Sequence, residues 1–142
     1  MDKVDEFHGV IIDDARDCMI LLVDDDDSVR ETAADMLEDL GYRVRQASGG
    51  LEALEVLSAN RDVDLMVTDI RMPGMSGLEL SDLASNRFRD LKIILISGYF
   101  QSKPAHRRFL QKPFRTRDLD AAIQAELAAT DNIGPFRANR PR

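Results

Sequence analysis

Short apolar runs that alternate with helical patterns constrain the fold of this chain more than any other feature. The runs lie at 19–23, 42–47, 63–67, 92–97 and 108–112. Such runs, when turn residues bound them, are typical of strands buried on both faces of a parallel sheet. Their alternation with helices predicts a doubly wound α/β fold with a five-stranded parallel sheet in the order 2-1-3-4-5.

The first helix has a recognisable start. Ser28 and Glu31 form a capping-box pattern, so we expect the helix to start at Ser28. Asp26 and Asp27 are interpreted as a solvated turn that leads to this cap. The helix is expected to end at Leu40, because Gly41 follows.

Three further helices are expected around 51–57, over 76–88 and from Thr116 onward, with Thr116 as the cap of the last one. Apolar residues at helical spacing mark the expected buried faces of all four helices. These residues are Val29, Ala33, Met36, Leu37, Leu40, Leu51, Leu54, Leu57, Leu80, Leu83, Phe88, Leu119, Ala122, Ile123 and Leu127.

Four of the expected strands end in polar side chains that suit phosphate chemistry. Asp24 and Asp25 follow the first strand, Asp69 follows the third, and Ser97 and Lys112 end the fourth and fifth. The carboxyl ends of parallel strands meet at one edge of the sheet, where ligands bind. An aspartate that ends a strand is more often a turn former, so the prediction depends on the combination of these side chains at four strand ends. It supplies a nucleophilic oxygen, carboxylates that could hold Mg²⁺, and donors for a phosphoryl group.

These residues stand in three motifs, read in chain order: Asp24-Asp25, Asp69-x-x-Met72-Pro73-Gly74-x-x-Gly77, and Lys112-Pro113-Phe114. In that order the motifs resemble the receiver domain of two-component response regulators, and the resemblance covers about residues 18–130. It implies a flavodoxin-like fold that accepts a phosphoryl group from a sensor histidine kinase or a phosphotransfer protein. Such a domain dephosphorylates slowly and is not a turnover enzyme.

The resemblance also implies the metal ligands. Asp69 matches the phosphoacceptor, and Asp25 matches the direct Mg²⁺ ligand. Asp24 matches its neighbour, which usually acts through water, and the backbone carbonyl of Arg71 matches a third protein ligand. Mg²⁺ is therefore the expected cofactor.

A second group of residues matches the switch of that family. Ser97 stands at the switch hydroxyl and Phe109 at the switch aromatic position. Lys112 matches the ammonium that pairs with the phosphoryl group, typically across a cis bond to the following Pro113. Phosphorylation is then expected to draw the Ser97 loop inward and to change the rotamer of Phe109, which alters a partner surface.

Composition agrees with a single domain and excludes some classes. The chain has 142 residues and a formal net charge of −7, which argues against direct nucleic-acid binding. Cys18 is the only cysteine, so no internal disulfide can form. No run approaches the length of a membrane span, and the N-terminus lacks the pattern of a signal peptide. A cytoplasmic location without membrane contact is expected.

The expected division is an N-terminal extension over 1–17, a receiver domain over 18–130 and a tail over 131–142. Residues 98–111 separate Ser97 from Lys112, and the fifth strand takes up the last of them. They are too few to hold a full fourth helix as well, and Pro104 interrupts them. We therefore expect that helix to be shortened or absent. Many receivers dimerise through the surface built around it, so a monomer or weak dimer is expected.

Two other functions remain open at this stage. A phosphatase of the haloacid dehalogenase type also uses a strand-end aspartate with Mg²⁺, and Asp25-Asp26-Asp27 contains its Asp-x-Asp spacing. That alternative leaves the motif at Asp69 unexplained. A binding module that keeps the fold without using phosphate is the other alternative, which the presence of all the site residues disfavours.

Overall fold

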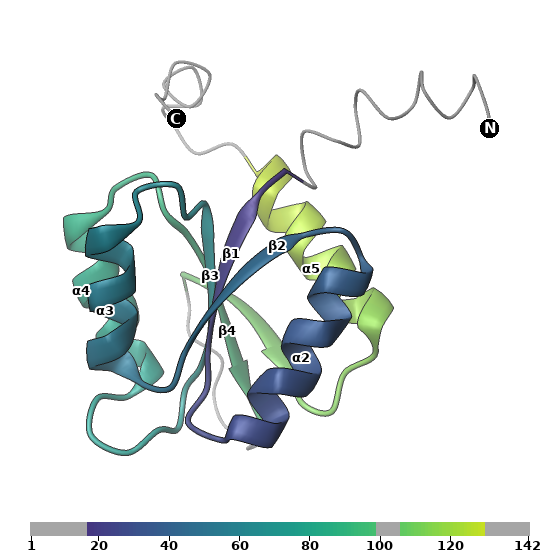
Figure 1. Cartoon of the computed structure of the whole chain (residues 1–142), viewed down its shortest axis with the longest axis horizontal. Helices are drawn as coiled ribbons and strands as arrows, with labels where there is room; N and C mark the ends of the chain where they lie inside the picture. The colour runs from purple at the N-terminus through teal and green to yellow at the C-terminus, as the bar shows by residue number, and fades with distance from the viewer. Residues whose placement is uncertain (1–16, 99–105, 130–142) are drawn as a thin grey trace.

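The computed structural model describes residues 17–98 and 106–129, which form one five-stranded sheet covered by helices on both faces (Figure 1). The strand order is β2-β1-β3-β4-β5, and every neighbouring pair is parallel. The strands are β1 (Met19–Val23), β2 (Arg43–Ala47), β3 (Leu65–Asp69), β4 (Lys92–Ser97) and β5 (Arg108–Gln111). The helices of the described part are α2 (Asp27–Asp39), α3 (Gly50–Ala59), α4 (Gly77–Arg87) and α5 (Thr116–Ala128).

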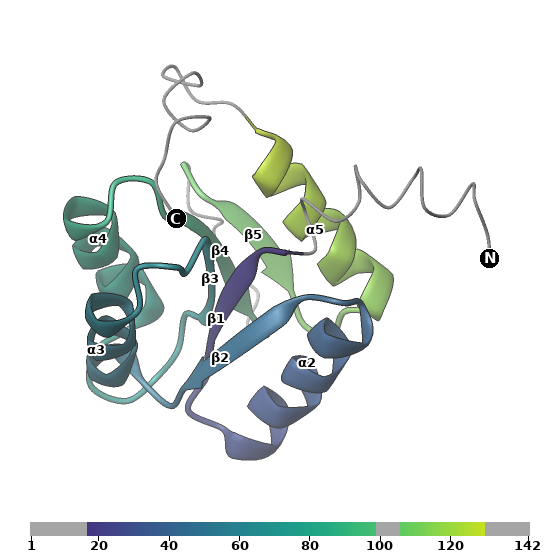
Figure 2. The ribbon, with the colours of Figure 1, turned by 45° about the horizontal axis from the view of Figure 1, so that its top comes forward.

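The sheet separates two apolar clusters, and the period of two along β1 assigns its side chains to them. Met19, Leu21 and Val23 belong to the cluster on the side of α3 and α4, whereas Ile20 and Leu22 belong to the cluster on the side of α2 and α5. Figure 2 shows the two helix pairs on opposite faces of the sheet. β1 is therefore buried on both faces, as a central parallel strand should be. Each fully buried Leu or Ile contributes about 1.5–3 kcal/mol to the stability of the fold.

The structure confirms the predicted fold class and strand order. Of the connection between β4 and β5, the structure describes only Gly98, His106 and Arg107, so the expected shortening or absence of a fourth helix there stays a prediction. Residues 99–105 of the connection lie outside the described part of the chain, and so do the extension over 1–16 and the tail over 130–142. No helix within the described ranges is long and apolar enough to cross a membrane.

The predicted cap of the first helix is wrong. The N-cap is Asp26, whose Oδ1 accepts a hydrogen bond from the N–H of Val29 at 3.0 Å. Helix α2 therefore begins at Asp27, and Ser28 already lies inside its first turn. The carboxylate is as good a cap as a hydroxyl, and its position two residues earlier is the one that reaches an unpaired N–H of the first turn.

The start of the last helix differs in the same way. Arg115 is the N-cap of α5 and Thr116 is its first helical residue, so Thr116 does not cap it. The carboxylate of Asp118 accepts a hydrogen bond from the N–H of Arg115 at 3.0 Å. Helix α4 starts as expected, with Ser76 and Glu79 forming a reciprocal capping box.

Three apolar residues expected in the core are exposed. Val29 is 39% exposed, Leu51 71% and Leu83 36%. At 100° per residue, Leu51 and Leu83 lie away from the middle of the buried stripes of α3 and α4. Val29, in the first turn of α2, also lies to one side of the stripe formed by Ala33, Ala34 and Leu37. The predicted apolar faces were therefore broader than the sheet can cover.

Candidate functional site

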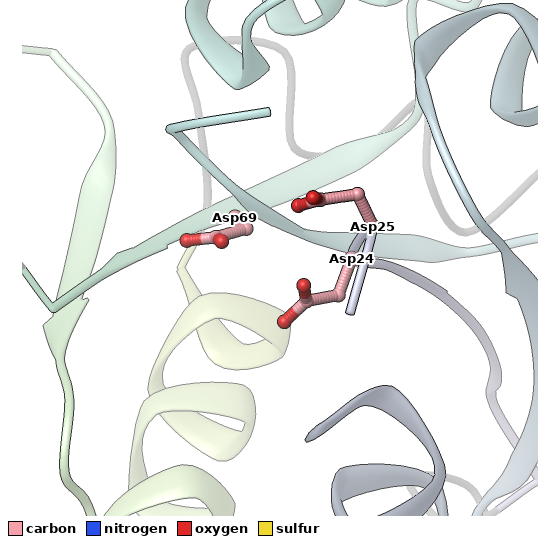
Figure 3. A group of neighbouring side chains, drawn as sticks. All are labelled: Asp24, Asp25 and Asp69. Carbon is pink, nitrogen blue, oxygen red and sulfur yellow. The ribbon is translucent and has the colours of Figure 1, made fainter. Parts of the chain in front are cut away.

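Three carboxylates converge at the carboxyl edge of the sheet. Asp24 and Asp25 directly follow β1, and Asp69 is the last residue of β3. The two strands are hydrogen-bonded neighbours with Val23 opposite Thr68, which brings their ends together. Each of the three aspartates offers a carboxylate oxygen, and these oxygens all lie within 4.8 Å of one another (Figure 3). The predicted juxtaposition of these side chains is therefore present.

A lysine from another strand end faces the same carboxylates. Lys112 Nζ lies 3.1 Å from Asp24 Oδ2 and 3.6 Å from Asp69 Oδ2. Lys112 follows β5, which ends one residue earlier, at Gln111, than the sequence suggested. Its backbone N–H donates to the carbonyl oxygen of Ser97 at 2.9 Å, and its peptide bond to Pro113 is cis, as predicted. The end of β4 thereby sets the position of the ammonium group.

Burial and charge oppose each other at Asp69. Burial raises the pKa of its carboxyl group above the ordinary value, and the Lys112 ammonium lowers it. The neighbouring Asp24 carboxylate raises the pKa further, whereas the N–H of Ile70, 3.1 Å from Asp69 Oδ1, lowers it. The net effect raises the pKa, so the ionised form of Asp69 is less favourable than that of an ordinary surface aspartate. A cation beside it would relieve this cost.

The loop that carries the acid pair is held by contacts with two elements, β2 and α2, and by one hydrogen bond within the loop. The N–H of Asp24 donates to the carbonyl oxygen of Ala47 at the end of β2, at 3.2 Å. Asp24 Oδ1 accepts from the N–H of Asp26 at 2.9 Å. Arg30 Nη1, from α2, donates to the backbone oxygen of Asp24 at 2.8 Å. Asp24 is buried, whereas Asp25 is exposed at the mouth of the site.

The turn after Asp69 depends on one glycine. The N–H of Gly77 donates to the carbonyl oxygen of Ile70 at 2.8 Å, which folds the loop back over the end of β3. A Cβ atom on Gly77 would collide with the backbone oxygen of Asp69 and with the backbone of Ile70. Gly74 has φ +75°, a conformation that L side chains rarely adopt. These two glycines of the motif are therefore structural requirements of the loop.

The donor set suits a small divalent cation. Mg²⁺ is bound through hard oxygen ligands, usually one or two carboxylates together with waters and phosphate oxygens. The facing carboxylates of Asp24, Asp25 and Asp69 are oxygen donors of this kind and repel one another without a cation. Arg71, whose carbonyl is the other predicted ligand, follows β3 by two residues and is exposed. Its role stays a prediction.

The two predicted switch residues lie on β4, the neighbour of β3, and on β5, the strand beyond it. Ser97 is fully buried at the end of β4. Phe109 lies in β5 opposite Leu95 and packs, partly buried, against the cluster on the side of α3 and α4. Ser97 is thus close in the fold to the backbone of Lys112, and Phe109 lies one strand further from Asp69. Their switching roles stay predictions.

Sequence reasoning missed two features beside the site. Arg30 was not assigned a role, although an arginine three residues after Asp27 could have been noticed as an i,i+3 pair. The second feature is a cavity of about 560 Å³, which we call the α2 groove. Its lining is mostly apolar and comprises Ser28, Val29, Thr32, Ala33, Met36, Gly98, Lys112, Pro113 and Phe114.

Comparison with known proteins agrees with the fold. The family model of the response regulator receiver domain matches residues 20–124. The response regulator receiver protein CpdR of Brucella abortus is 37% identical over 117 residues, which cover 78% of this chain and 97% of CpdR. The chain therefore belongs to the response regulator receiver domain family.

Other relatives differ in length or are known as structures. The sensor kinase CckA of Brucella abortus is 35% identical over 120 residues, and the match covers 79% of this chain but only 13% of CckA. A crystal structure of a CckA receiver domain has a TM-score of 0.69 at 34% identity and covers 77% of this chain and 98% of that one. The response regulator TrrA of Thermotoga maritima, crystallised with Mg²⁺ and beryllofluoride, has a TM-score of 0.71 at 31% identity. That match covers 76% of this chain and 97% of TrrA.

Proposed function

We propose that this chain accepts a phosphoryl group on Asp69 from a histidine of a sensor kinase or a phosphotransfer protein, in a reaction that depends on Mg²⁺. The observation that supports this most is the convergence of three carboxylates and one ammonium group. Asp24, Asp25 and Asp69 face one another within 4.8 Å, and Lys112 Nζ contacts both Asp24 and Asp69. A cytoplasmic location, expected from the sequence, is part of the same proposal.

The chemistry follows from the charges at the site. Ionised Asp69 attacks the phosphorus, and the bond between phosphorus and the imidazole nitrogen of the donor breaks as the new oxygen–phosphorus bond forms. Bound Mg²⁺ supplies charge neutralisation for the phosphoryl oxygens. Lys112 adds a donor at the same place, since it already lies 3.6 Å from Asp69 Oδ2. Asp24, Asp25 and Asp69 would hold the cation together with the backbone carbonyl of Arg71.

The response to phosphorylation would start at Ser97. Its hydroxyl would donate a hydrogen bond to a phosphoryl oxygen and draw the end of β4 toward Asp69. Phe109, which is only partly buried, would change its packing in response. A change of charge at one residue then becomes a change of surface on β4 and β5. The product would dephosphorylate slowly, so the chain would act as a phosphoacceptor and not as a turnover enzyme.

The partner needs a surface beside the site, and the α2 groove supplies one. Lys112 lines the groove and its ammonium group contacts Asp69, so a protein seated there is next to Asp69. We propose that a helix of the histidine-bearing donor occupies this groove. An amphipathic helix suits a mostly apolar groove on a helix face, and exposed Val29 would contact it.

The decisive experiment is phosphorylation by a small donor. Incubation of the full chain with acetyl phosphate and Mg²⁺ should add the mass of one phosphoryl group, and the same incubation of Asp69→Asn should add none. Phosphorylation of Asp69→Asn to the level of the parent would overturn the proposal. Sustained hydrolysis of p-nitrophenyl phosphate would instead support the haloacid dehalogenase alternative. A folded parent that binds no Mg²⁺ would support the phosphate-independent binding module.

A further inference from the structure

Arg30 contacts both ends of the acidic loop, which comprises Asp24 to Asp27, and also contacts strand β2. Its Nη1 donates to the backbone oxygen of Asp24 at 2.8 Å, and its Nη2 lies 2.9 Å from Asp27 Oδ1. Its Nε donates to Gln46 Oε1 of β2 at 2.9 Å. All three guanidinium nitrogens are thus engaged, and only 12% of the side chain is exposed. This planar fork holds three groups in one geometry.

The loop needs such a hold because its own charges oppose its conformation. Four consecutive carboxylates, Asp24 to Asp27, follow one another in the loop, and two of them, Asp24 and Asp25, converge with Asp69. Their mutual repulsion favours conformations in which the loop opens and the carboxylates separate. A site that must gather them around a small cation therefore benefits from contacts that fix the backbone before the cation binds.

Asp25 depends on the loop backbone more than Asp24 does. The Asp24 carboxylate has its own partners, the N–H of Asp26 and the ammonium of Lys112. Within the described part of the chain, the Asp25 carboxylate has no hydrogen bond or ion pair of this kind, and the residue is exposed. The direction of Asp25 is therefore set by the backbone on either side of it. Arg30 grips that backbone at Asp24 and the side chain at Asp27.

The guanidinium also avoids competing with a cation. It contacts the backbone oxygen of Asp24 and the Asp27 carboxylate, neither of which belongs to the group of converging carboxylates. The guanidinium therefore does not occupy the carboxylate oxygens of Asp24 and Asp25, which face Asp69. We propose that Arg30 is a positioning residue of the magnesium site, which holds the acidic loop in the conformation that binds Mg²⁺. This inference rests on the proposed function, because it concerns the same cation.

The test compares variants that keep the charge. Arg30→Lys retains the positive charge and loses the fork, so a change in Mg²⁺ affinity reports geometry. We expect its Mg²⁺ dissociation constant, measured by isothermal titration calorimetry on the full chain, to rise about tenfold. Arg43→Lys is the matched control. Arg43, at the start of β2, also donates to a backbone oxygen, that of Asp17, and it lies outside the loop. Its dissociation constant should stay within about twofold.

A second variant separates the loop from an ordinary ion pair. Asp27→Asn removes only the i,i+3 pair with Arg30 and leaves the contact with Asp24. If Arg30 acts through the ion pair alone, Asp27→Asn will weaken Mg²⁺ binding as much as Arg30→Lys does, which would contradict the inference. We expect a change of less than about threefold for Asp27→Asn.

Kinetics give an independent readout. For Arg30→Lys, the Mg²⁺ concentration that half-saturates phosphorylation by acetyl phosphate should rise, while the rate at saturating Mg²⁺ should stay within about twofold of the parent. An Arg30→Lys chain that binds Mg²⁺ as the parent does would overturn the inference. Should this variant fail to fold, Gln46→Leu removes one of the three contacts at an exposed position, and we expect its dissociation constant to rise roughly threefold. Unchanged affinity in Gln46→Leu would then refute the positioning role.

The two proposals fail in different ways. A parent chain that binds no Mg²⁺ and gains no phosphoryl group would refute the proposed function. A parent that does both, with Arg30→Lys binding Mg²⁺ equally well, would leave the function intact and refute only the role of Arg30.

Discussion

Asp69 shows how a carboxyl group held in a partly buried site can weaken the fold that carries it. Burial and the Asp24 carboxylate raise its pKa, and they outweigh the lowering effects of Lys112 and the N–H of Ile70. A folded-state pKa above the unfolded value means that the folded chain binds a proton more tightly than the unfolded chain does. Stability must then fall as the pH rises from the ordinary pKa of 3.8 through the raised value.

This sign leads to the first prediction, on stability. Asp69→Asn should be more stable than the parent at neutral pH in the absence of divalent cations, by on the order of 1 kcal/mol, because it removes one charge from a group of facing carboxylates. Thermal melts in a chelating buffer measure the difference. The stability difference should shrink as the pH falls toward 3.8, because the Asp69 carboxyl group of the parent then becomes protonated and is uncharged like Asn. An Asn variant less stable than the parent at neutral pH would contradict this account.

Gly77 carries the second prediction at the scale of single residues. Gly77→Ala should destabilise the chain by about 2–3 kcal/mol, because the added methyl group collides with the backbone of Asp69 and Ile70, which cannot rotate away. Urea unfolding measures the change. Gly49→Ala is the matched control, since a Cβ there meets nothing within 4 Å, and its cost should stay below about 1 kcal/mol. Equal stability of the two variants would show that the turn can relax.

At the scale of elements, the polar residues that stand at the strand ends were more predictable from the sequence than the residues that cap the helices. A buried parallel strand shows itself as an apolar run, and the switch to Asp24 or Asp69 marks its end without knowledge of the rest of the fold. A helix start depends on which side chain reaches an unpaired N–H, and several neighbours compete for it. Asp26 and Ser28 both suit a cap by residue type. Only the coordinates show that the Asp26 carboxylate accepts from Val29.

The site was predictable to the extent that it follows strand ends. Strand order brings the ends of β1 and β3 together, and the motif order anticipated Lys112 beside them. The role of Arg30 was not predictable, since it depends on a three-way contact between α2, the acidic loop and β2. Whether Leu51 is buried depends on how its helix is rotated against the sheet, which an apolar pattern defines only coarsely.

The corrected cap of α2 gives the third prediction. Asp26→Ala should destabilise the chain by about 1 kcal/mol, because the N–H of Val29 loses its side-chain acceptor at the helix start. Ser28→Ala should cost less than about 0.5 kcal/mol, since Ser28 is inside the helix and not its cap. Chemical denaturation of both variants in the same buffer tests the pair. A larger cost for Ser28→Ala would restore the original sequence prediction.

At the scale of the whole molecule, two exposed apolar side chains of the described residues, Val29 and Leu51, lie on opposite faces. Val29 belongs to α2 and lines the α2 groove, whereas Leu51 belongs to α3 across the sheet (Figure 1). Both side chains are exposed, so replacing either with a neutral polar residue should leave the core and the net charge unchanged. The two positions therefore form a matched pair for testing which face meets the phosphodonor.

The fourth prediction uses this pair. With a histidine kinase that phosphorylates the parent chain, Val29→Gln should slow phosphotransfer about tenfold, as expected for loss of one apolar anchor at an interface. Leu51→Gln should transfer at the parent rate. Acetyl phosphate needs no protein docking, so both variants should react with it as the parent does. Slow transfer in Leu51→Gln with normal transfer in Val29→Gln would assign docking to α3 and α4. Slow reaction of Val29→Gln with acetyl phosphate as well would mean that the substitution disturbs Asp69 itself, through Lys112, which lines the groove with Val29 and contacts Asp69.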